Sequence, residues 1–153
     1  MKEIPFGRYF EQFRKGDVYK HSVRKTILES DNNIFSLLTM NHHPVHLDVH
    51  YAQCQHHGKI LVVGTLVFSL AVGLTVADIS GKAIANLEYG EIIHTAPVFI
   101  GDTIRAETII LDARKSKSQN DRGIVYVKTK VYNQTNDQVL SFTRKVLVKS
   151  KND

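Results

Sequence analysis

The sequence contains little of what marks several classes of protein. Cys54 is the single cysteine among 153 residues, so no disulfide can form within the chain, and a reducing cytoplasm is the expected location. Nine glycines and three prolines argue against a collagen-like or low-complexity chain. The first residues, MKEIPFGRYFEQF, lack the apolar stretch of a secretory signal. The composition, 42% hydrophobic and 23% charged, instead predicts a folded chain, and the length favours a single domain over residues 1–153.

The net charge of +5 comes entirely from the last third of the chain. The first hundred residues carry nine basic and nine acidic residues, whereas the remainder carries eleven and six. The densest basic segment, residues 114–122, includes Lys115, Lys117 and Arg122 but no aromatic residue. Nucleic-acid interfaces usually combine clustered basic residues with aromatics, so no nucleic-acid partner is predicted. We interpret the segment as a solvated loop between strands, with a site for a phosphate-bearing small ligand as the alternative.

An uncharged stretch over residues 60–77 reaches the lower length limit of a bilayer span. However, it contains two glycines and three hydroxyl residues, and no aromatic belt flanks it. A helix that is apolar all round is equally typical of a protein core. We therefore predict a buried central helix over residues 64–79, ended by Ser80 and Gly81, and no membrane partner.

The other elements follow from periodicity and from helix and strand breakers. Before the central helix we predict a strand over residues 17–27, a short helix over 32–40 capped by Ser30 or Asp31, a loop over 41–48 in which Pro44 stops that helix, and a helical turn within 49–57. After it, we predict strands over residues 83–93, 103–113, 124–132 and 139–148. This order indicates an α+β fold: an antiparallel sheet, its last four strands joined largely by turns, curves around the long central helix.

Six of the eight histidines lie in the segment before the central helix. His42, His46 and His50 are four residues apart, and on a continuous helix this spacing would place three imidazoles on one face and suggest zinc. Pro44 interrupts any such helix, so no metal site is predicted. Most histidines of the segment, His43 among them, are expected at exposed loop or helix positions.

Three segments resemble the MaoC-like, (R)-specific enoyl-CoA hydratase family. The string NHHPVHLD at residues 41–48 resembles the family motif Asp-x-Asn-Pro-x-His. The segments GKI and VG, within residues 58–64, look like the approach to the family's central helix, and APVFIGDTI at residues 96–104 looks like its Pro-Val-x-x-Gly-Asp-Thr-Leu turn. The resemblance extends over residues 7–148 and implies the hotdog fold, a curved antiparallel sheet around a long helix. That fold agrees with the α+β architecture predicted from periodicity.

The resemblance implies a hydratase or dehydratase that interconverts an enoyl-CoA and a 3-hydroxyacyl-CoA without a cofactor. His46 matches the family's catalytic histidine, but the catalytic aspartate falls on Asn41 and the family's asparagine on His43. Val63 stands where a histidine often precedes the helix glycine. The variant of the family motif found here, Asn-x-His-Pro-x-His-x-Asp, resembles that of a sub-branch of the family. This sub-branch includes hydratases of branched or dicarboxylic esters such as mesaconyl- or itaconyl-CoA.

The addition of water to an enoyl thioester explains why a histidine, an amide and a helix N-terminus are needed. Histidine exchanges protons near neutral pH, so His46 is the expected proton-transferring residue. The first turn of the helix at Gly64 offers free N–H groups and a positive dipole end to an enolate oxygen. Asn41 can orient water but cannot take its proton, so either His46 acts alone or Asp31 or Asp48 substitutes. The alternative roles are helix capping for Asp31 and a structural hydrogen bond for Asp48.

The resemblance also implies an assembly and substrate contacts. We expect a homodimer or larger homo-oligomer with the site near the subunit boundary. Lys115, Lys117 and Arg122 are then candidates to bind the phosphates of an acyl-CoA thioester, and His43 and Val63 are further candidate substrate contacts. Two other functions stay open: a hotdog thioesterase, and a non-catalytic acyl-CoA-binding protein, which the missing aspartate would favour.

Overall fold

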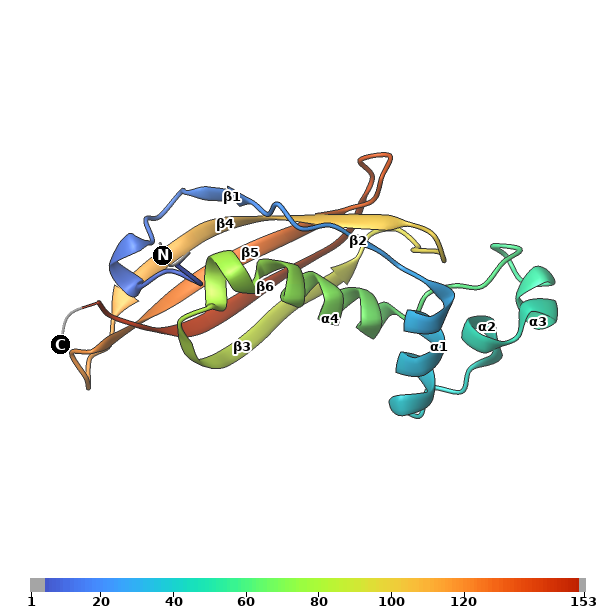
Figure 1. Cartoon of the computed structure of the whole chain (residues 1–153), viewed down its shortest axis with the longest axis horizontal. Helices are drawn as coiled ribbons and strands as arrows, with labels where there is room; N and C mark the ends of the chain where they lie inside the picture. The colour runs from blue at the N-terminus through green and yellow to red at the C-terminus, as the bar shows by residue number, and fades with distance from the viewer. Residues whose placement is uncertain (1–4, 152–153) are drawn as a thin grey trace, which may run out of the picture.

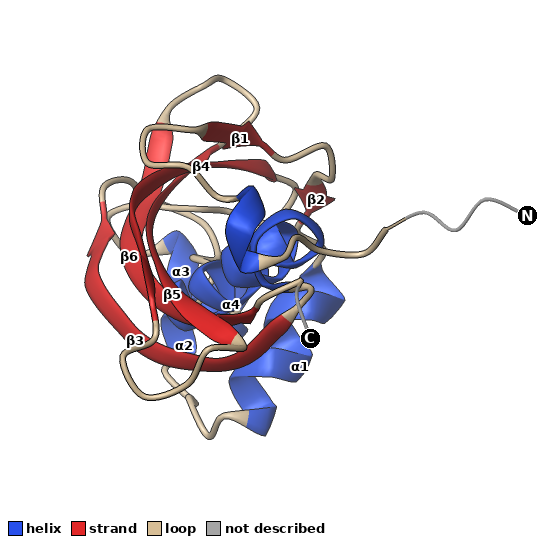
Figure 2. Ribbon diagram, turned by 90° about the vertical axis from the view of Figure 1, so that its left-hand side faces the viewer, coloured by secondary structure: helices blue, strands red, loops and turns tan. Residues whose placement is uncertain are grey.

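The computed structural model describes residues 5–151. Its strands are β1 (Val18–Lys20), β2 (Lys25–Thr26), β3 (Ala83–His94), β4 (Thr103–Lys115), β5 (Arg122–Tyr132) and β6 (Gln138–Lys149). Its helices are α1 (Glu29–Leu38), α2 (Pro44–Leu47), α3 (Val49–Gln53) and α4 (Gly64–Thr75), with a 3₁₀ turn η1 (Phe10–Gln12) and a π-helical turn η2 (Val76–Ser80). The sheet is antiparallel in the order β1–β4–β5–β6–β3, and it curves around α4 (Figures 1 and 2).

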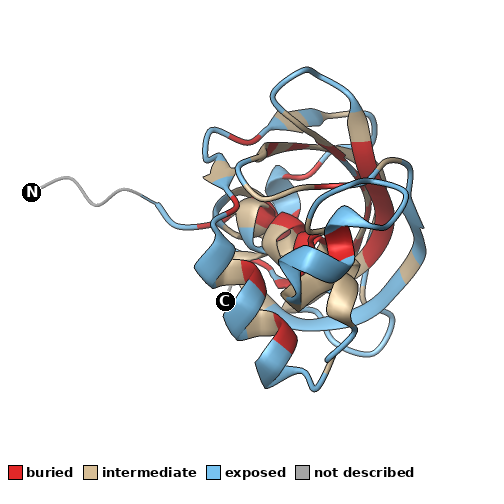
Figure 3. Ribbon diagram, turned by 90° about the vertical axis from the view of Figure 1, so that its right-hand side faces the viewer, coloured by how far each residue is buried: buried red, intermediate tan, exposed pale blue. Residues whose placement is uncertain are grey.

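The central helix is where the sequence predicts it. Helix α4 begins at Gly64, and η2 carries the helical path on to Ser80. Leu66, Val67 and Ala71 of α4 are at most 5% exposed and belong to one apolar cluster with Leu140 and Phe142 of β6. Burying each of the larger side chains contributes about 1.5–3 kcal/mol, and the buried residues lie between helix and sheet (Figure 3). Within residues 5–151, no helix has the length and apolarity required to span a membrane.

The segments before α4 differ from the predictions. The single strand expected over residues 17–27 is divided into β1 and β2, which both pair with β4. The helix expected over 32–40 starts at Glu29, and its N-cap position is Leu28 rather than Ser30 or Asp31. Instead, the Asp31 carboxylate accepts a hydrogen bond from the N–H of Leu28, which closes the first turn. The predicted loop over 41–48 contains α2, because Pro44 occupies the first helical turn, where its missing N–H costs nothing.

The connection between β3 and β4 also differs from the expected series of turns. β3 pairs with β6, whereas β4 lies on the other side of β5, so residues 95–102 cross from one part of the sheet to another. The Val62 N–H donates to the Val98 carbonyl (2.9 Å) and ties this crossover to the segment just before α4. The crossover therefore brings the end of β3 close to the beginning of the central helix.

Candidate active site

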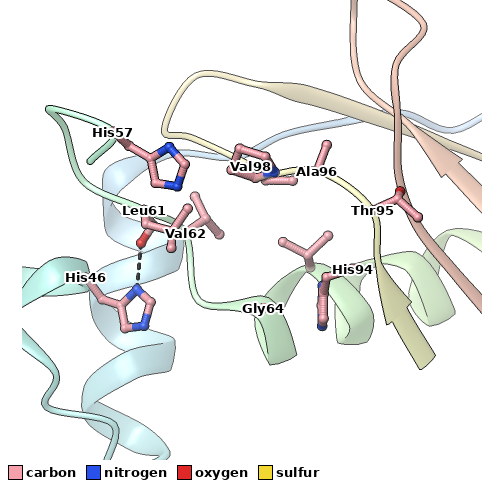
Figure 4. A pocket seen from close by; sticks show the side chains of 11 residues that line it. His46, His57, Leu61, Val62, Gly64, His94, Thr95, Ala96 and Val98 are labelled. Atoms are coloured by element: carbon pink, nitrogen blue, oxygen red, sulfur yellow. Dashed lines mark hydrogen bonds between the residues drawn. The ribbon is translucent and has the colours of Figure 1, made fainter. Parts of the chain in front are cut away.

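A cavity of about 360 Å³ lies at the N-terminus of α4, between α2 and the crossover that follows β3 (Figure 4). Its polar lining consists of His46, His57, His94 and Thr95, together with Gly64 of the helix. Its apolar lining consists of Leu61, Val62, Val67, Ala96, Pro97 and Val98. The cavity thus combines a mostly apolar wall with a few imidazoles at a helix terminus.

His46 is fixed on one side of its ring only. Its Nδ1 lies 2.7 Å from the carbonyl oxygen of Leu61. A carbonyl can only accept, so Nδ1 carries the hydrogen and Nε2 of the neutral ring keeps its lone pair. Among the hydrogen bonds of residues 5–151, Nε2 has no partner, and the side chain lines the cavity. This tautomer equips His46 to accept a proton at Nε2.

Asn32 of α1 connects His46 to the central helix. Its side chain is 2% exposed, its Nδ2 donates to the carbonyl oxygen of His46 (3.0 Å), and its Oδ1 accepts from the N–H of Val63 (3.0 Å). The sequence alone does not single out this residue. Asparagine is disfavoured inside helices, which is a weak signal, but the sequence does not show what Asn32 contacts.

The beginning of α4, where an oxyanion site is predicted, lies at the cavity. Gly64 is the first helical residue and lines the cavity, and the N–H of Val63 is already bound to Asn32. The N–H of Gly64 has no acceptor among the hydrogen bonds of the part of the chain that the structure describes. It lies at the positive end of a twelve-residue helix. The side chain of Val63 is 1% exposed and packs in the core.

The two candidate carboxylates are engaged outside the cavity. Asp31 accepts from the Leu28 N–H and forms an ion pair with Lys25 (2.7 Å). The hydrogen bonds from Lys25 and from the Leu28 backbone hold the pKa of Asp31 below its usual value. Asp48 caps α3 by accepting from the N–H of Tyr51 (3.0 Å). These contacts correspond to the structural roles that the sequence analysis gave as alternatives.

Asn41 and His43 shape the turn that leads into α2. Asn41 Oδ1 accepts from the His43 N–H (3.3 Å), and the Asn41 N–H donates to the carbonyl of Ser36 at the end of α1 (2.9 Å). His43 Nδ1 accepts from the N–H of Val45 and caps α2 (3.1 Å). Neither side chain lines the cavity. Their contacts support the helix that carries His46.

The basic segment over residues 114–122 connects β4 to β5 at the end of the sheet opposite α1, α2 and α3 (Figure 1). Within it, Arg122 forms two hydrogen bonds to the carboxylate of Asp121 (2.7 and 2.9 Å), whereas Lys115 and Lys117 are exposed. The loop is therefore remote from the cavity of its own chain.

The evenly spaced histidines are not grouped with other potential metal ligands in the part of the chain that the structure describes. For residues 5–151, no three His, Cys, Asp or Glu side chains are grouped so that they could hold a metal ion. His42 and His50 are exposed, and neither lines the cavity that contains His46.

A curved antiparallel sheet around a long helix, with a cavity at the start of that helix, defines a hotdog protein. The chain belongs to the MaoC-like domain family, whose model matches residues 11–133. A mesaconyl-CoA hydratase of Cereibacter sphaeroides is 34% identical over 95% of this chain and 42% of its own length. A beta-methylmalyl-CoA dehydratase of Chloroflexus aurantiacus is 32% identical over 95% of this chain and 41% of its own.

The solved structure of a putative MaoC domain protein dehydratase from Chloroflexus aurantiacus superposes with a TM-score of 0.90. The two sequences are 32% identical, and the match covers 95% of this chain and 41% of that one. This chain therefore spans about two-fifths of the length of the relatives compared. The hotdog fold and the family inferred from the three sequence segments are confirmed.

Proposed function

We propose that the chain is a hydratase that interconverts an enoyl-CoA thioester and a 3-hydroxyacyl-CoA. The observation that carries the proposal is His46, whose Nδ1 is bound to a carbonyl while Nε2 is free beside a cavity at the N-terminus of α4. The names of the two related enzymes support the same reaction.

In the hydration direction, His46 Nε2 takes a proton from water, and the water oxygen forms a bond to C3 of the enoyl group. The π electrons of the double bond then move toward the thioester oxygen and form an enolate. The free N–H of Gly64 and the positive end of α4 stabilise the charge on that oxygen. Protonation of C2 completes the 3-hydroxyacyl-CoA.

The acyl group that we propose is branched or dicarboxylic. The relatives are named for mesaconyl-CoA and beta-methylmalyl-CoA, and the cavity has apolar walls with imidazoles among them. A small branched acyl group carrying a second carboxylate fits both features. A histidine can donate a hydrogen bond to that carboxylate.

For Asn41 we propose a positioning role: an amide cannot accept the proton of water, but Asn41 Oδ1 holds the turn that leads into α2 and His46. Asn41→Asp is expected to be tolerated with a shifted pH optimum, whereas Asn41→Ala should lose most of the rate. Asp31→Asn and Asp48→Asn, assayed beside them, test the alternative that a carboxylate is the base, although both carboxylates are engaged in helix caps outside the cavity. If Asp31→Asn were as inactive as His46→Gln, the carboxylate rather than Asn41 would complete the proton transfer.

We further propose that two copies of the chain assemble as a homodimer or a larger homo-oligomer in the cytoplasm. β3 is an edge strand of the sheet, and its apolar side chains are 39–52% exposed: Ile84, Leu87, Tyr89, Ile92 and Ile93. Proteins usually cover exposed apolar edge strands, because such strands tend to pair with other chains. In such an assembly, the loop over residues 114–122 of one copy is proposed to bind the CoA phosphates at the other.

A panel of enoyl-CoA and 3-hydroxyacyl-CoA esters, including mesaconyl-CoA, tests the proposed activity. Loss of the absorbance of the conjugated double bond, with the hydrated ester identified by mass spectrometry, is the expected result. Release of free CoA would instead indicate a thioesterase. Tight binding without turnover would indicate a non-catalytic acyl-CoA-binding protein, the alternative that the amide at position 41 favours.

A further inference from the structure

Hydration needs two proton transfers, but the cavity presents a single histidine of the family motif. One group must take a proton from water, and a second must deliver a proton to C2. None of the described residues that line the cavity carries a carboxylate; their titratable side chains are His46, His57 and His94. The two carboxylates considered from the sequence, Asp31 and Asp48, are held by their own helix caps. The second proton donor is therefore to be sought among the other histidines.

His94 is placed where that donor is needed. It is the last residue of β3, and its backbone pairs with Leu140 of β6. Its ring lies directly against the first residue of α4, because a methyl group placed on Gly64 would lie 3.0 Å from Cε1 and 3.1 Å from Nε2 of His94. Figure 4 shows His46 and His94 on either side of Gly64. A thioester whose oxygen meets the N–H of Gly64 therefore has one imidazole on each side.

Neither ring nitrogen of His94 takes part in a hydrogen bond within residues 5–151, so both are available to a ligand. His57 is less suited to the role. Its ring packs edge-on against Phe99 (5.4 Å between centroids) and against His56 (4.9 Å) on the loop before α4. His94, by contrast, lies on a strand that the sheet holds in place.

We infer that His94 delivers and removes the proton at C2, while His46 serves the water. The inference rests on the proposed hydratase function and names a residue outside the family motif. His46 Nε2 takes the proton as the water oxygen bonds to C3, and the enolate forms. The electron pair of the enolate then forms the C2–H bond with a proton from a His94 ring nitrogen. His46 passes its proton to solvent and His94 regains one, so the balance is enoyl-CoA plus water to 3-hydroxyacyl-CoA.

The first experiment compares hydration by the parent protein, His94→Gln and the exposed control His50→Gln. Loss of a general acid commonly costs about 10²–10⁴ in rate, so kcat of His94→Gln should fall by at least about a hundredfold, with KM changed only a few-fold and the thermal midpoint unchanged. His50→Gln should hydrate at the parent rate. Retention of the parent kcat by His94→Gln would overturn the inference, whereas a parent without hydration activity would overturn the proposed function itself.

The second experiment separates the transfer at C2 from the addition of water. A saturated acyl-CoA in D₂O has C2 hydrogens to exchange but no double bond to hydrate, and mass spectrometry follows the exchange. The parent and His46→Gln should both exchange, since this half-reaction needs only the C2 base and the helix terminus. His94→Gln should not. Exchange by His94→Gln at the parent rate, or no exchange by the parent, would show that His94 is not the group that transfers this proton.

Discussion

His21 and His46 are both held by a hydrogen bond of 2.7 Å at Nδ1, but they differ at the other ring nitrogen. His21 is 7% exposed, and its Nε2 lies 2.8 Å from Thr108 Oγ1, which in turn bonds to Thr129 (2.9 Å). His46 has no such partner at Nε2 in the part of the chain described, and it lines a cavity. An imidazole engaged on both sides belongs to the scaffold, whereas one with a free nitrogen can transfer protons.

The two histidines also lie at opposite ends of the central helix. His46 is near Gly64, and His21 is bound to Asp78 of η2, the π-helical turn that follows α4. The other carboxylate oxygen of Asp78 accepts from Arg8 (2.9 Å). At the Asp78 end of the helix the histidine is therefore held in a network of hydrogen bonds, whereas at the Gly64 end one ring nitrogen of the histidine is free.

The largest effect should come from His46→Gln. Glutamine keeps a hydrogen-bonding side chain but cannot act as a base, so we expect hydration to fall by about 10²–10⁴-fold. Binding of an acyl-CoA and the urea unfolding midpoint should remain close to those of the parent. Full activity in this variant, measured with the ester that the parent hydrates best, would remove His46 from the mechanism.

The next effect concerns Asn32, which holds His46 relative to α4. In Asn32→Asp, the new carboxylate can still accept a hydrogen bond from the N–H of Val63. It cannot donate one to the carbonyl oxygen of His46, which therefore loses its donor. A buried group left without its partner costs about 1–3 kcal/mol. We expect that loss in the free energy of unfolding, and a fall in kcat of more than tenfold because His46 is displaced. Asn33→Asp, at the exposed neighbouring position, is the control and should change neither quantity.

The features predicted correctly from sequence are those that depend on local patterning. An uncharged run of helical length locates α4 to within a residue at its start, and alternation of apolar residues locates β4, β5 and β6 to within about two residues. His46, which the motif singles out, is one of the residues that line the cavity, and its role in proton transfer stays a prediction.

The missed features depend on contacts between distant segments. Asn32 and Val63 are 31 residues apart and share a buried hydrogen bond, and nothing in either local sequence indicates the other. His94 likewise reaches Gly64 only because β3 pairs with β6 and the chain then crosses over. The predicted start of α1, Asn32, lies after the observed start, Glu29, because the sequence does not distinguish an N-cap aspartate from Asp31, which accepts from the N–H of Leu28 from inside the first turn.

A smaller effect, on the stability of the fold, is expected at Asp78, which lies in η2 at the far end of the central helix from Gly64. Burial alone would raise the pKa of Asp78, but hydrogen bonds and charges from Arg8 and His21 outweigh it and hold the pKa below the usual 3.8. Because the folded pKa is depressed, this carboxylate stabilises the fold above about pH 4 and loses that contribution as the pH falls through its folded pKa.

Asp78→Asn should therefore lower the free energy of unfolding by about 1 kcal/mol at pH 7. It should also show a shallower loss of stability than the parent between pH 5 and pH 3, roughly the range over which carboxylates titrate. Urea titrations at several pH values measure both. Hydration per folded molecule should stay within about twofold of the parent. A large loss of kcat without loss of stability would mean that the hydrogen bonds of Asp78 with Arg8 and His21 influence the candidate active site.

The smallest effect should come from Lys115 and Lys117, which lie remote from the cavity of their own chain. Exposed ionic contacts are worth about 0.2–1 kcal/mol each. The double variant Lys115→Ala/Lys117→Ala should therefore raise KM for the acyl-CoA a few-fold and leave kcat unchanged, the pattern of lost uniform binding. Lys20→Ala/Lys130→Ala, at two other exposed positions, is the matched control and should leave both unchanged.

Mixing variants then decides whether the loop acts on a neighbouring copy. A dimer of one His46→Gln chain and one Lys115→Ala/Lys117→Ala chain contains one site with an intact His46 and, if the loop reaches across, an intact loop from the partner. Re-equilibrating equal amounts of the two variants makes about half of the dimers mixed pairs by random pairing, and only these and the lysine-variant homodimers keep active sites. About half of the sites with an intact His46 should therefore regain the parent KM, so that the rate at low substrate rises above that of the lysine variant mixed with an unrelated protein. If the loop served its own chain, the mixture would keep the raised KM of the lysine variant, and the proposed phosphate contact between copies would be wrong.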